Sequence, residues 1–185
     1  RIGGANVPTP RGTVTTPDAP DLQGMLGAMA EDGVESVAME VSSHALALHR
    51  VAGIEFDVAG FTMFGQDHLD FHASLEEYFE VKSRLFLGGR TRCAVLNIDD
   101  PWGRRLLGLV RADGRARAIT TGVESTDADY RVISWKTGAD GRSEVTLTTP
   151  AGDVQYTISM LGDFNVRNSL TALAMVGAAG LDVAR

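Results

Sequence analysis

The sequence contains a single cysteine, Cys93, so no disulfide framework can stabilise the fold. It has no stretch rich in lysine and arginine, and its net charge of −7 argues against a nucleic-acid-binding surface. No run of about 18 apolar residues occurs, and the N-terminus lacks the pattern of a signal peptide. We therefore expect no membrane partner and a cytoplasmic location. The 185 residues, 44% of them hydrophobic, can bury one sizeable core but are too few for two full α/β domains.

Helices and strands are expected to alternate up to residue 114, which predicts an α/β fold with a mainly parallel sheet flanked by helices. Apolar spacing and capping residues predict helices after Asp18, at 43–50, at 74–86 and from 101 toward 110. Short apolar runs predict strands at 36–41, 56–62 and 93–98.

The pattern changes near residue 115. Strands are expected at 115–120, 129–136, 143–149 and 154–160, with turns rich in glycine and aspartate between the last three. We interpret 1–114 as the α/β part of one domain, 115–161 as a small antiparallel meander and 162–185 as a returning helix.

Polar residues follow two of the expected strands. Glu40 closes the first, and a second cluster after 56–62 contains Asp67, His68, Asp70 and His72. Ligands of open α/β sheets bind at the carboxyl ends of strands, so the two clusters could share one site. Glu40 could equally be a helix cap or the partner of a salt bridge.

The carboxylates in these clusters are hard oxygen donors, which favours Mg²⁺ or Mn²⁺ over a structural Zn²⁺. His68 and His72 have the spacing of a zinc-protease pair, but Leu69 stands where such an enzyme needs a general-base glutamate. We therefore exclude a zinc protease.

Lys82 lies within the apolar stripe of the expected helix at 74–86, which begins with the capping pair Ser74 and Glu77. Its stem could cover apolar surface while its ammonium reaches water. Alternatively, burial could leave a neutral amine available for chemistry or modification. The residues around it decide between the two.

Five motifs resemble the central domain of the Mur ligases: TTPDAPDL, EVSSHAL, QDHLDFH with a lysine ten residues beyond its last histidine, LNIDDPWG and GDFNVRNSL. They follow one another along nearly the whole chain. The likeness is strongest to members of the family that make UDP-N-acetylmuramoyl tripeptides.

The resemblance implies an ATP-dependent amide-bond ligase of peptidoglycan synthesis. Such an enzyme adds a diamino acid, meso-diaminopimelate or L-lysine, to UDP-N-acetylmuramoyl-L-alanyl-D-glutamate through an acyl phosphate. Two Mg²⁺ ions would offset phosphate charge during phosphoryl transfer.

The resemblance also implies roles for individual residues. Glu40 and His68 would bind Mg²⁺, and Lys82 would carry a CO₂-derived carbamate that supplies a further metal ligand, so these three residues form the expected catalytic set. The residues expected to hold the uridylyl-muramoyl substrate are Thr15, Thr16, Ser42 and Arg50. Those expected to approach the adenine of ATP are Asn165 and Asn168.

The sequence departs from the family pattern in two ways. Met63 stands where the family has asparagine, and methionine cannot make the same hydrogen bonds. The Gly-rich P-loop that holds ATP phosphates does not occur in these 185 residues. We therefore expect an incomplete central domain without its P-loop strand and without activity alone. A sheet edge exposed in this way could support a dimer.

Three other functions remain open. The chain could derive from another ligase of the same superfamily, such as folylpolyglutamate synthetase or cyanophycin synthetase. It could be a non-catalytic module that binds a nucleotide sugar. It could also be a metal-dependent hydrolase built on Asp67, His68 and His72.

Overall fold

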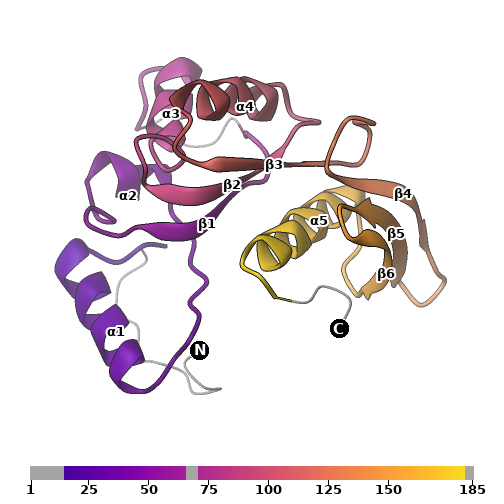
Figure 1. Ribbon diagram of the computed structural model, residues 1–185, viewed down its shortest axis with the longest axis horizontal. Coiled ribbons are helices and arrows are strands. Elements are labelled where there is room, and N and C mark those ends of the chain that lie inside the picture. Colours follow the sequence, from indigo (N-terminus) through magenta and orange to yellow (C-terminus); the bar gives the residue numbers. More distant parts are fainter. Residues whose placement is uncertain (1–14, 66–70, 182–185) are drawn as a thin grey trace. The chain divides into compact units, whose positions relative to one another are not determined.

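The structure is a computed structural model that describes residues 15–65 and 71–181 (Figure 1). The chain divides into two compact units. The first contains residues 1–54 and 68–84, and the second contains residues 55–67 and 85–185. Each unit is described by itself.

In its described residues, the first unit contains three helices, α1 (Ala19–Glu31), α2 (Ser43–Ala47) and α3 (Leu75–Ser83). Helix α1 follows Asp18, as predicted, and the chain leaves it through Gly33, whose φ of 76° suits glycine. The predicted cap of α3 is confirmed, because Ser74 Oγ accepts a hydrogen bond from the Glu77 amide at 3.1 Å. The Glu77 carboxylate in turn accepts one from the amide of Ala73 at 2.7 Å.

The strand predicted at 36–41 is wrong, because this segment has no regular secondary structure. A strand requires a ladder of hydrogen bonds with a neighbouring strand. Here a side chain takes that place: Thr16 Oγ1 donates to the Glu40 carbonyl oxygen at 2.9 Å and accepts from the Ser42 amide at 3.2 Å. Most residues of this run are exposed, so its hydrophobicity indicated neither a strand nor burial.

The second unit is built on one six-stranded sheet, in which the strands follow their order in the sequence. Neighbouring strands from β1 to β4 are parallel, and β4, β5 and β6 are antiparallel. This confirms the predicted mainly parallel α/β class with a small antiparallel part. The strands are β1 (Phe56–Phe61), β2 (Thr91–Asn97), β3 (Arg117–Gly122), β4 (Tyr130–Thr137), β5 (Ser143–Thr149) and β6 (Gly152–Ile158).

The antiparallel part begins at β4 and not at residue 115 as predicted. Helix α4 (Pro101–Asp113) connects β2 to β3, and a helical crossover returns the chain in the parallel direction. Strand β3 therefore belongs to the parallel part. The returning helix is present as α5 (Asp163–Ala178).

Helices α4 and α5 cover opposite faces of the sheet (Figure 1). On the α5 side, Val95, Leu147 and Leu170 belong to one buried cluster. On the α4 side, a Cβ at Gly103 would lie 1.9 Å from the Asn97 carbonyl oxygen, so only glycine allows this close approach. The buried β2 strand thus fixes the turn that leads into α4.

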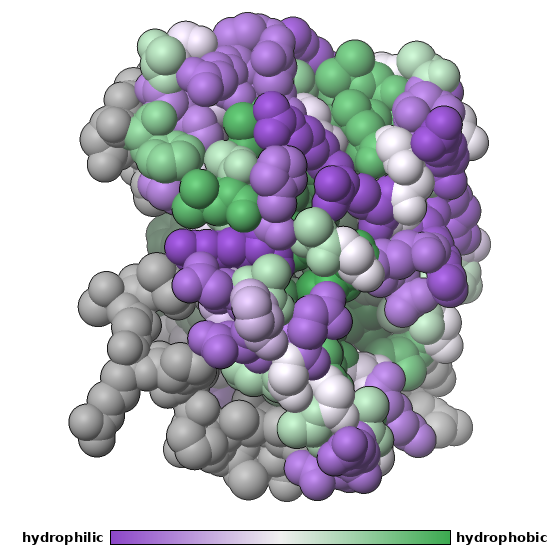
Figure 2. Space-filling view, turned by 90° about the vertical axis from the view of Figure 1, so that its left-hand side faces the viewer, coloured by the Kyte–Doolittle hydropathy of each residue, from purple (hydrophilic) through white to green (hydrophobic). Residues whose placement is uncertain are grey.

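The described residues include no helix long and apolar enough to cross a membrane. On the face drawn in Figure 2, hydrophobic residues form separate patches among hydrophilic ones.

Candidate functional site

Thr16 is the centre of a polar cluster in the first unit. Its side chain is fully buried, and its hydroxyl bridges the Glu40 carbonyl oxygen and the Ser42 amide. Ser42 also caps α2, because its Oγ accepts from the Ala45 amide at 3.2 Å. The hydroxyl of Thr16 therefore ties two segments of the chain together, whereas the neighbouring Thr15 is exposed.

Arg50 joins the same cluster from the end of the segment that follows α2. Its Nη1 donates to the Thr16 carbonyl oxygen at 3.0 Å, and its Nε lies 2.8 Å from the Asp18 carboxylate in an ion pair without hydrogen-bond geometry. The Arg50 side chain is 17% exposed. In the described part of the chain, Nη2 makes no hydrogen bond or ion pair. The guanidinium is thus held in place while one donor group is left for a ligand.

A second group of side chains in the first unit surrounds Tyr78, which is 4% exposed. The ring of buried His72 stacks on Tyr78 with centroids 5.0 Å apart, and His72 Nε2 lies 2.9 Å from Ser43 Oγ in a hydrogen bond. The amine of Lys82 lies 5.1 Å from the Tyr78 ring centroid. An ammonium is attracted to the face of such a ring, so this geometry suits the unmodified, charged lysine.

The expected metal ligands are only partly within the described residues. Asp67, His68 and Asp70 lie outside them. Glu40 is exposed, and the contact that places it is made by its backbone carbonyl oxygen. Residues 15–65 and 71–181 contain no group of three or more His, Cys, Asp or Glu side chains that could hold a metal ion. These residues alone do not make a Mg²⁺ site.

In the second unit, the two expected adenine residues lie near the start of α5. Asn165 and Asn168 are three residues apart and therefore share one side of the helix. Asn165 is partly buried, and its Nδ2 donates to the Leu161 carbonyl oxygen at 2.7 Å, while Asn168 is exposed. The side-chain oxygen of Asn165 is left as an acceptor.

An ion-pair cluster adjoins this part of α5. Arg167 Nη1 donates to Asp99 at 2.5 Å and Arg167 Nη2 donates to Glu124 at 2.5 Å. Asp99, whose side chain is 5% exposed, also accepts from the Val123 amide at 2.7 Å and from the Ser125 amide at 2.8 Å. The cluster thus links the turn after β2, the loop after β3 and helix α5.

The hydrogen bonds at Asp99 determine its charge state. Burial acts to raise the pKa of Asp99, but the Ser125 hydroxyl, two backbone amides and the charge of Arg167 outweigh burial and lower the pKa below its ordinary value. Asp99 is therefore ionised at neutral pH and matches the guanidinium.

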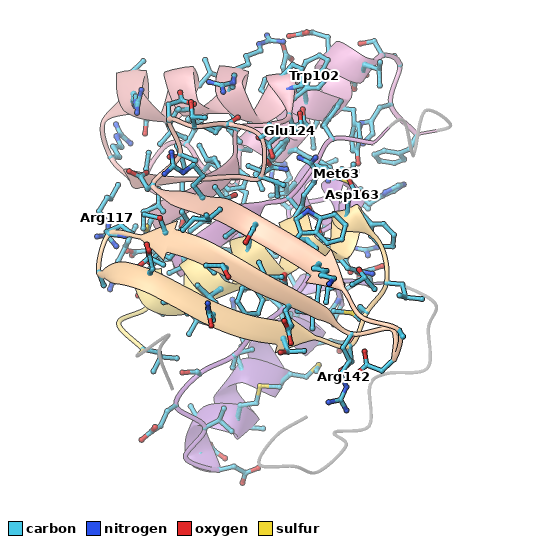
Figure 3. The ribbon with its side chains drawn as sticks, turned by 90° about the vertical axis from the view of Figure 1, so that its right-hand side faces the viewer. Met63, Trp102, Arg117, Glu124, Arg142 and Asp163 are labelled. Atoms are coloured by element: carbon cyan, nitrogen blue, oxygen red, sulfur yellow. The ribbon has the colours of Figure 1, made fainter. Side chains whose placement is uncertain are left out.

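Figure 3 shows that residues from several elements gather at the edge of the sheet where the parallel strands end. Met63, Trp102, Glu124 and Asp163 lie toward this edge, and Arg117 lies at the opposite one. Such an edge is where open α/β sheets bind ligands.

Met63 follows β1 at this edge, and its side chain is 53% exposed. The next residue is anchored firmly: the Phe64 amide donates to Asp100 at 2.6 Å, and its ring lies 4.7 Å from that of Trp102. The other oxygen of Asp100 caps α4 by accepting from the Trp102 amide at 2.8 Å. The chain next to Met63 is thus held through a backbone amide.

Sequence reasoning missed Asp99 and Arg167. Neither residue was singled out. In the structure, Gly122 precedes the loop that Asp99 binds. A Cβ at Gly122 would lie 3.2 Å from the Asp99 carboxylate and 2.9 Å from Ser125 Cβ. Only the fold connects these residues.

Comparison with known proteins identifies the family. Residues 2–176 match the family described as Mur ligase middle domain. The chain is 42% identical over 98% of its length to UDP-N-acetylmuramoyl-L-alanyl-D-glutamate--2,6-diaminopimelate ligase of Corynebacterium efficiens, and 41% identical over 98% to the protein of that name from Streptomyces coelicolor. It covers only 34% and 35% of these relatives, about a third of their length.

A solved structure of a 2,6-diaminopimelate ligase of this name has the same fold. It superposes with a TM-score of 0.84 at 30% identity, over 91% of this chain and 34% of that one. The chain belongs to the Mur ligase middle-domain family.

Proposed function

We propose that this chain is the central part of an ATP-dependent ligase that adds a diamino acid to UDP-N-acetylmuramoyl-L-alanyl-D-glutamate in peptidoglycan synthesis. The names of the relatives support this reaction, and they favour 2,6-diaminopimelate over L-lysine as the diamino acid. The observation that carries the proposal is the convergence of Thr16, Ser42 and Arg50, which are up to 34 residues apart in the sequence.

In this proposal the first unit holds the anionic uridylyl-muramoyl substrate. The Nη2 group of Arg50 donates to a phosphate or carboxylate oxygen, and hydrogen bonds between charged partners are stronger than neutral ones. Thr16 acts indirectly, because its hydroxyl is used within the chain and its carbonyl oxygen orients Arg50. Ser42 and the exposed Thr15 complete the proposed contacts.

In the second unit, Asn165 and Asn168 contact the adenine of ATP. The side-chain oxygen of Asn165 is an acceptor and suits the exocyclic amine of adenine. ATP activates the glutamyl carboxylate as an acyl phosphate, which the incoming amine attacks.

The test is calorimetric titration of the chain with UDP-N-acetylmuramoyl-L-alanyl-D-glutamate. Arg50→Ala is expected to weaken binding by about tenfold or more, because a hydrogen bond to a charged group contributes about 1.5–3 kcal/mol. Arg92→Ala is the matched control, since Arg92 is an exposed arginine of the second unit paired with Glu55 and Asp57. It should leave the affinity unchanged.

Arg50→Lys serves as a second variant in case Arg50→Ala unfolds the first unit. It keeps the charge but loses the planar fork, so it should fold and still bind less tightly. Equal affinity of the unchanged chain, Arg50→Ala and Arg50→Lys for the substrate would contradict the proposal. A folded, unchanged chain that does not bind the substrate would also contradict it. Binding of the substrate without any binding of ATP would instead favour the non-catalytic nucleotide-sugar module.

The metal and the carbamate remain predictions. Glu40, His68 and a carbamate on Lys82 are the ligands expected for Mg²⁺, which would offset phosphate charge when bound. Carbon-13 bicarbonate and NMR would detect a carbamate signal, and Lys82→Arg is the control that should abolish it. Absence of the signal from the folded chain at high bicarbonate concentration would contradict the prediction.

The expected dimer and the cytoplasmic location are further predictions. Strands β1 and β6 are the outermost of the sheet among the described residues, and an outermost strand offers backbone groups for pairing. Analytical sedimentation over a range of concentrations tests the dimer. A strictly monomeric profile would contradict it.

A further inference from the structure

Helix α5 presents its two asparagines on one side and Arg167 on another. An α-helix turns by about 100° per residue. Asn165 and Asn168 are therefore only about 60° apart around the helix axis, and Arg167 lies about 160° from Asn165 and about 100° from Asn168. Arg167 thus leaves the helix on a different side from the two asparagines.

The guanidinium of Arg167 lies in a network of ion pairs and hydrogen bonds. Its guanidinium contacts three carboxylates, those of Asp99, Glu124 and, at 3.5 Å from Nε, Asp163. Asp99 is itself fixed by the backbone amides of the loop after β3 and by the Ser125 hydroxyl at 2.7 Å. A movement of α5 would therefore break several charge-assisted hydrogen bonds at once.

The start of α5 has no side-chain cap. Its N-cap is Gly162, which has a φ of 98° and offers no side chain to cap the helix. Val166 and Leu170 anchor the buried side of α5 in the core, and the bond from Asn165 to the Leu161 carbonyl oxygen holds its first turn. Arg167 adds the contacts that link the start of the helix to the turn after β2 and the loop after β3.

We propose that Arg167 is a positioning residue for base selection, which acts through Asn165 and Asn168 and does not itself touch the nucleotide. This inference rests on the proposed adenine site. With the Nδ2 of Asn165 used by Leu161, its oxygen faces the ligand as an acceptor. An acceptor fits the amine of adenine and opposes the carbonyl oxygen that guanine carries at that position. Such a choice requires a fixed start of the helix, and Arg167 holds that start against the two loops in addition to the core packing of Val166 and Leu170.

The experiment measures the affinities of the chain for ATP and GTP in parallel, together with urea unfolding of each variant. Arg167→Lys keeps the charge but cannot reach Asp99 and Glu124 together. It is expected to reduce the preference for ATP over GTP by about tenfold, since small displacements of binding groups have large effects. Glu124→Gln is the matched control, because Glu124 is 76% exposed and Asp99 still holds Arg167. Its preference should stay within about twofold of the unchanged chain.

Asp99→Asn is a second variant in case Arg167→Lys does not fold. It removes the buried charge that holds Arg167 Nη1 and should also lower the preference for ATP over GTP, by about two- to threefold or more.

The outcomes separate the inference from the function on which it rests. Loss of the ATP preference in a folded Arg167→Lys chain supports the inference. A preference that is retained while only stability falls overturns it and leaves the proposed function intact. A folded, unchanged chain that does not bind ATP overturns both the inference and the nucleotide part of the proposed function.

Discussion

The two polar clusters of the molecule are built in opposite ways. In the first unit, Thr16 is the centre, and neutral side-chain and backbone groups provide most of the bonds around it. In the second unit, the centre is the ionised Asp99, which holds three backbone amides, a hydroxyl and a guanidinium. Both clusters contain residues of recognised motifs, but residues of the first are expected to bind the substrate, whereas Asp99 and Arg167 of the second hold neighbouring elements in place.

This difference predicts unequal sensitivity to mutation. Removing a buried carboxylate leaves the charge of its guanidinium partner unpaired. This lowers the free energy of unfolding more than the loss of a neutral hydroxyl does. The predictions below follow from this comparison.

The largest effect is expected for Asp99→Ala. The change leaves Arg167 without its buried partner and the amides of Val123 and Ser125 without an acceptor, so unfolding free energy should fall by about 3 kcal/mol or more. Urea unfolding followed by tryptophan fluorescence measures it, because Trp102 and Trp135 both lie in the second unit. Asp127→Ala removes a surface pair with Arg104 and should cost less than about 1 kcal/mol. Equal losses in the two variants would refute the special role of Asp99.

A smaller loss is expected for Thr16→Val, which keeps the shape and removes the bridging hydroxyl. The Glu40 carbonyl oxygen and the Ser42 amide lose a partner, and stability should fall by about 1–3 kcal/mol. Thermal unfolding of the helices by circular dichroism is the measurement. Thr15→Val is the matched control, because Thr15 is exposed and should change stability by less than about 0.5 kcal/mol. A Thr15 effect as large as that of Thr16 would show that the bridge contributes nothing.

A still smaller difference separates two substitutions of Asp100. Asp100→Ser can still cap α4 but cannot also reach the Phe64 amide, whereas Asp100→Ala loses both bonds. We expect the alanine variant to be about 1 kcal/mol less stable than the serine variant. Hydrogen exchange at the Phe64 amide should be accelerated in both. Protection of that amide in either variant would contradict the double role of Asp100.

The smallest effect concerns pH. The pKa of Asp99 is lowered in the folded chain, so its contribution to stability is complete above the ordinary carboxyl pKa of about 4 and is lost as the pH falls through the lower folded value. The stability of the unchanged chain should therefore decrease below about pH 4 more steeply than that of Asp99→Asn. Urea midpoints between pH 3 and pH 6 would measure the slopes. Parallel slopes would mean that Asp99 does not titrate differently on folding.

Local signals predicted much of the fold. Ser74 with Glu77, and Asp100 before Pro101, marked helix starts that the structure confirms. The apolar run at 36–41 misled because hydrophobicity alone cannot show whether a neighbouring strand is present, and most of these residues are exposed. The direction of β3 was missed because it depends on the crossover through α4.

Some residues of the candidate site could be predicted and others could not, because local patterns do not show contacts between distant segments. Thr16 and Ser42 lie in motifs that can be recognised, Arg50 lies four residues beyond one of them, and the structure brings the three together. Asp99 and Arg167 are 68 residues apart, and nothing in either local pattern indicates a pair. That the hydroxyl of Thr16 is occupied by the backbone also required the fold, because the bridge closes over 24 residues.

The central claim is that the muramoyl substrate binds at the Thr16 cluster and ATP binds at the start of α5. NMR of the isotope-labelled chain tests this claim most directly. UDP-N-acetylmuramoyl-L-alanyl-D-glutamate and ATP would be added separately. The account predicts that the muramoyl substrate shifts the signals of Ser42 and Arg50, and that ATP shifts the side-chain amides of Asn165 and Asn168. Shifts by ATP at Ser42 and Arg50 with none at α5, or no shifts by either ligand in a folded sample, would contradict it.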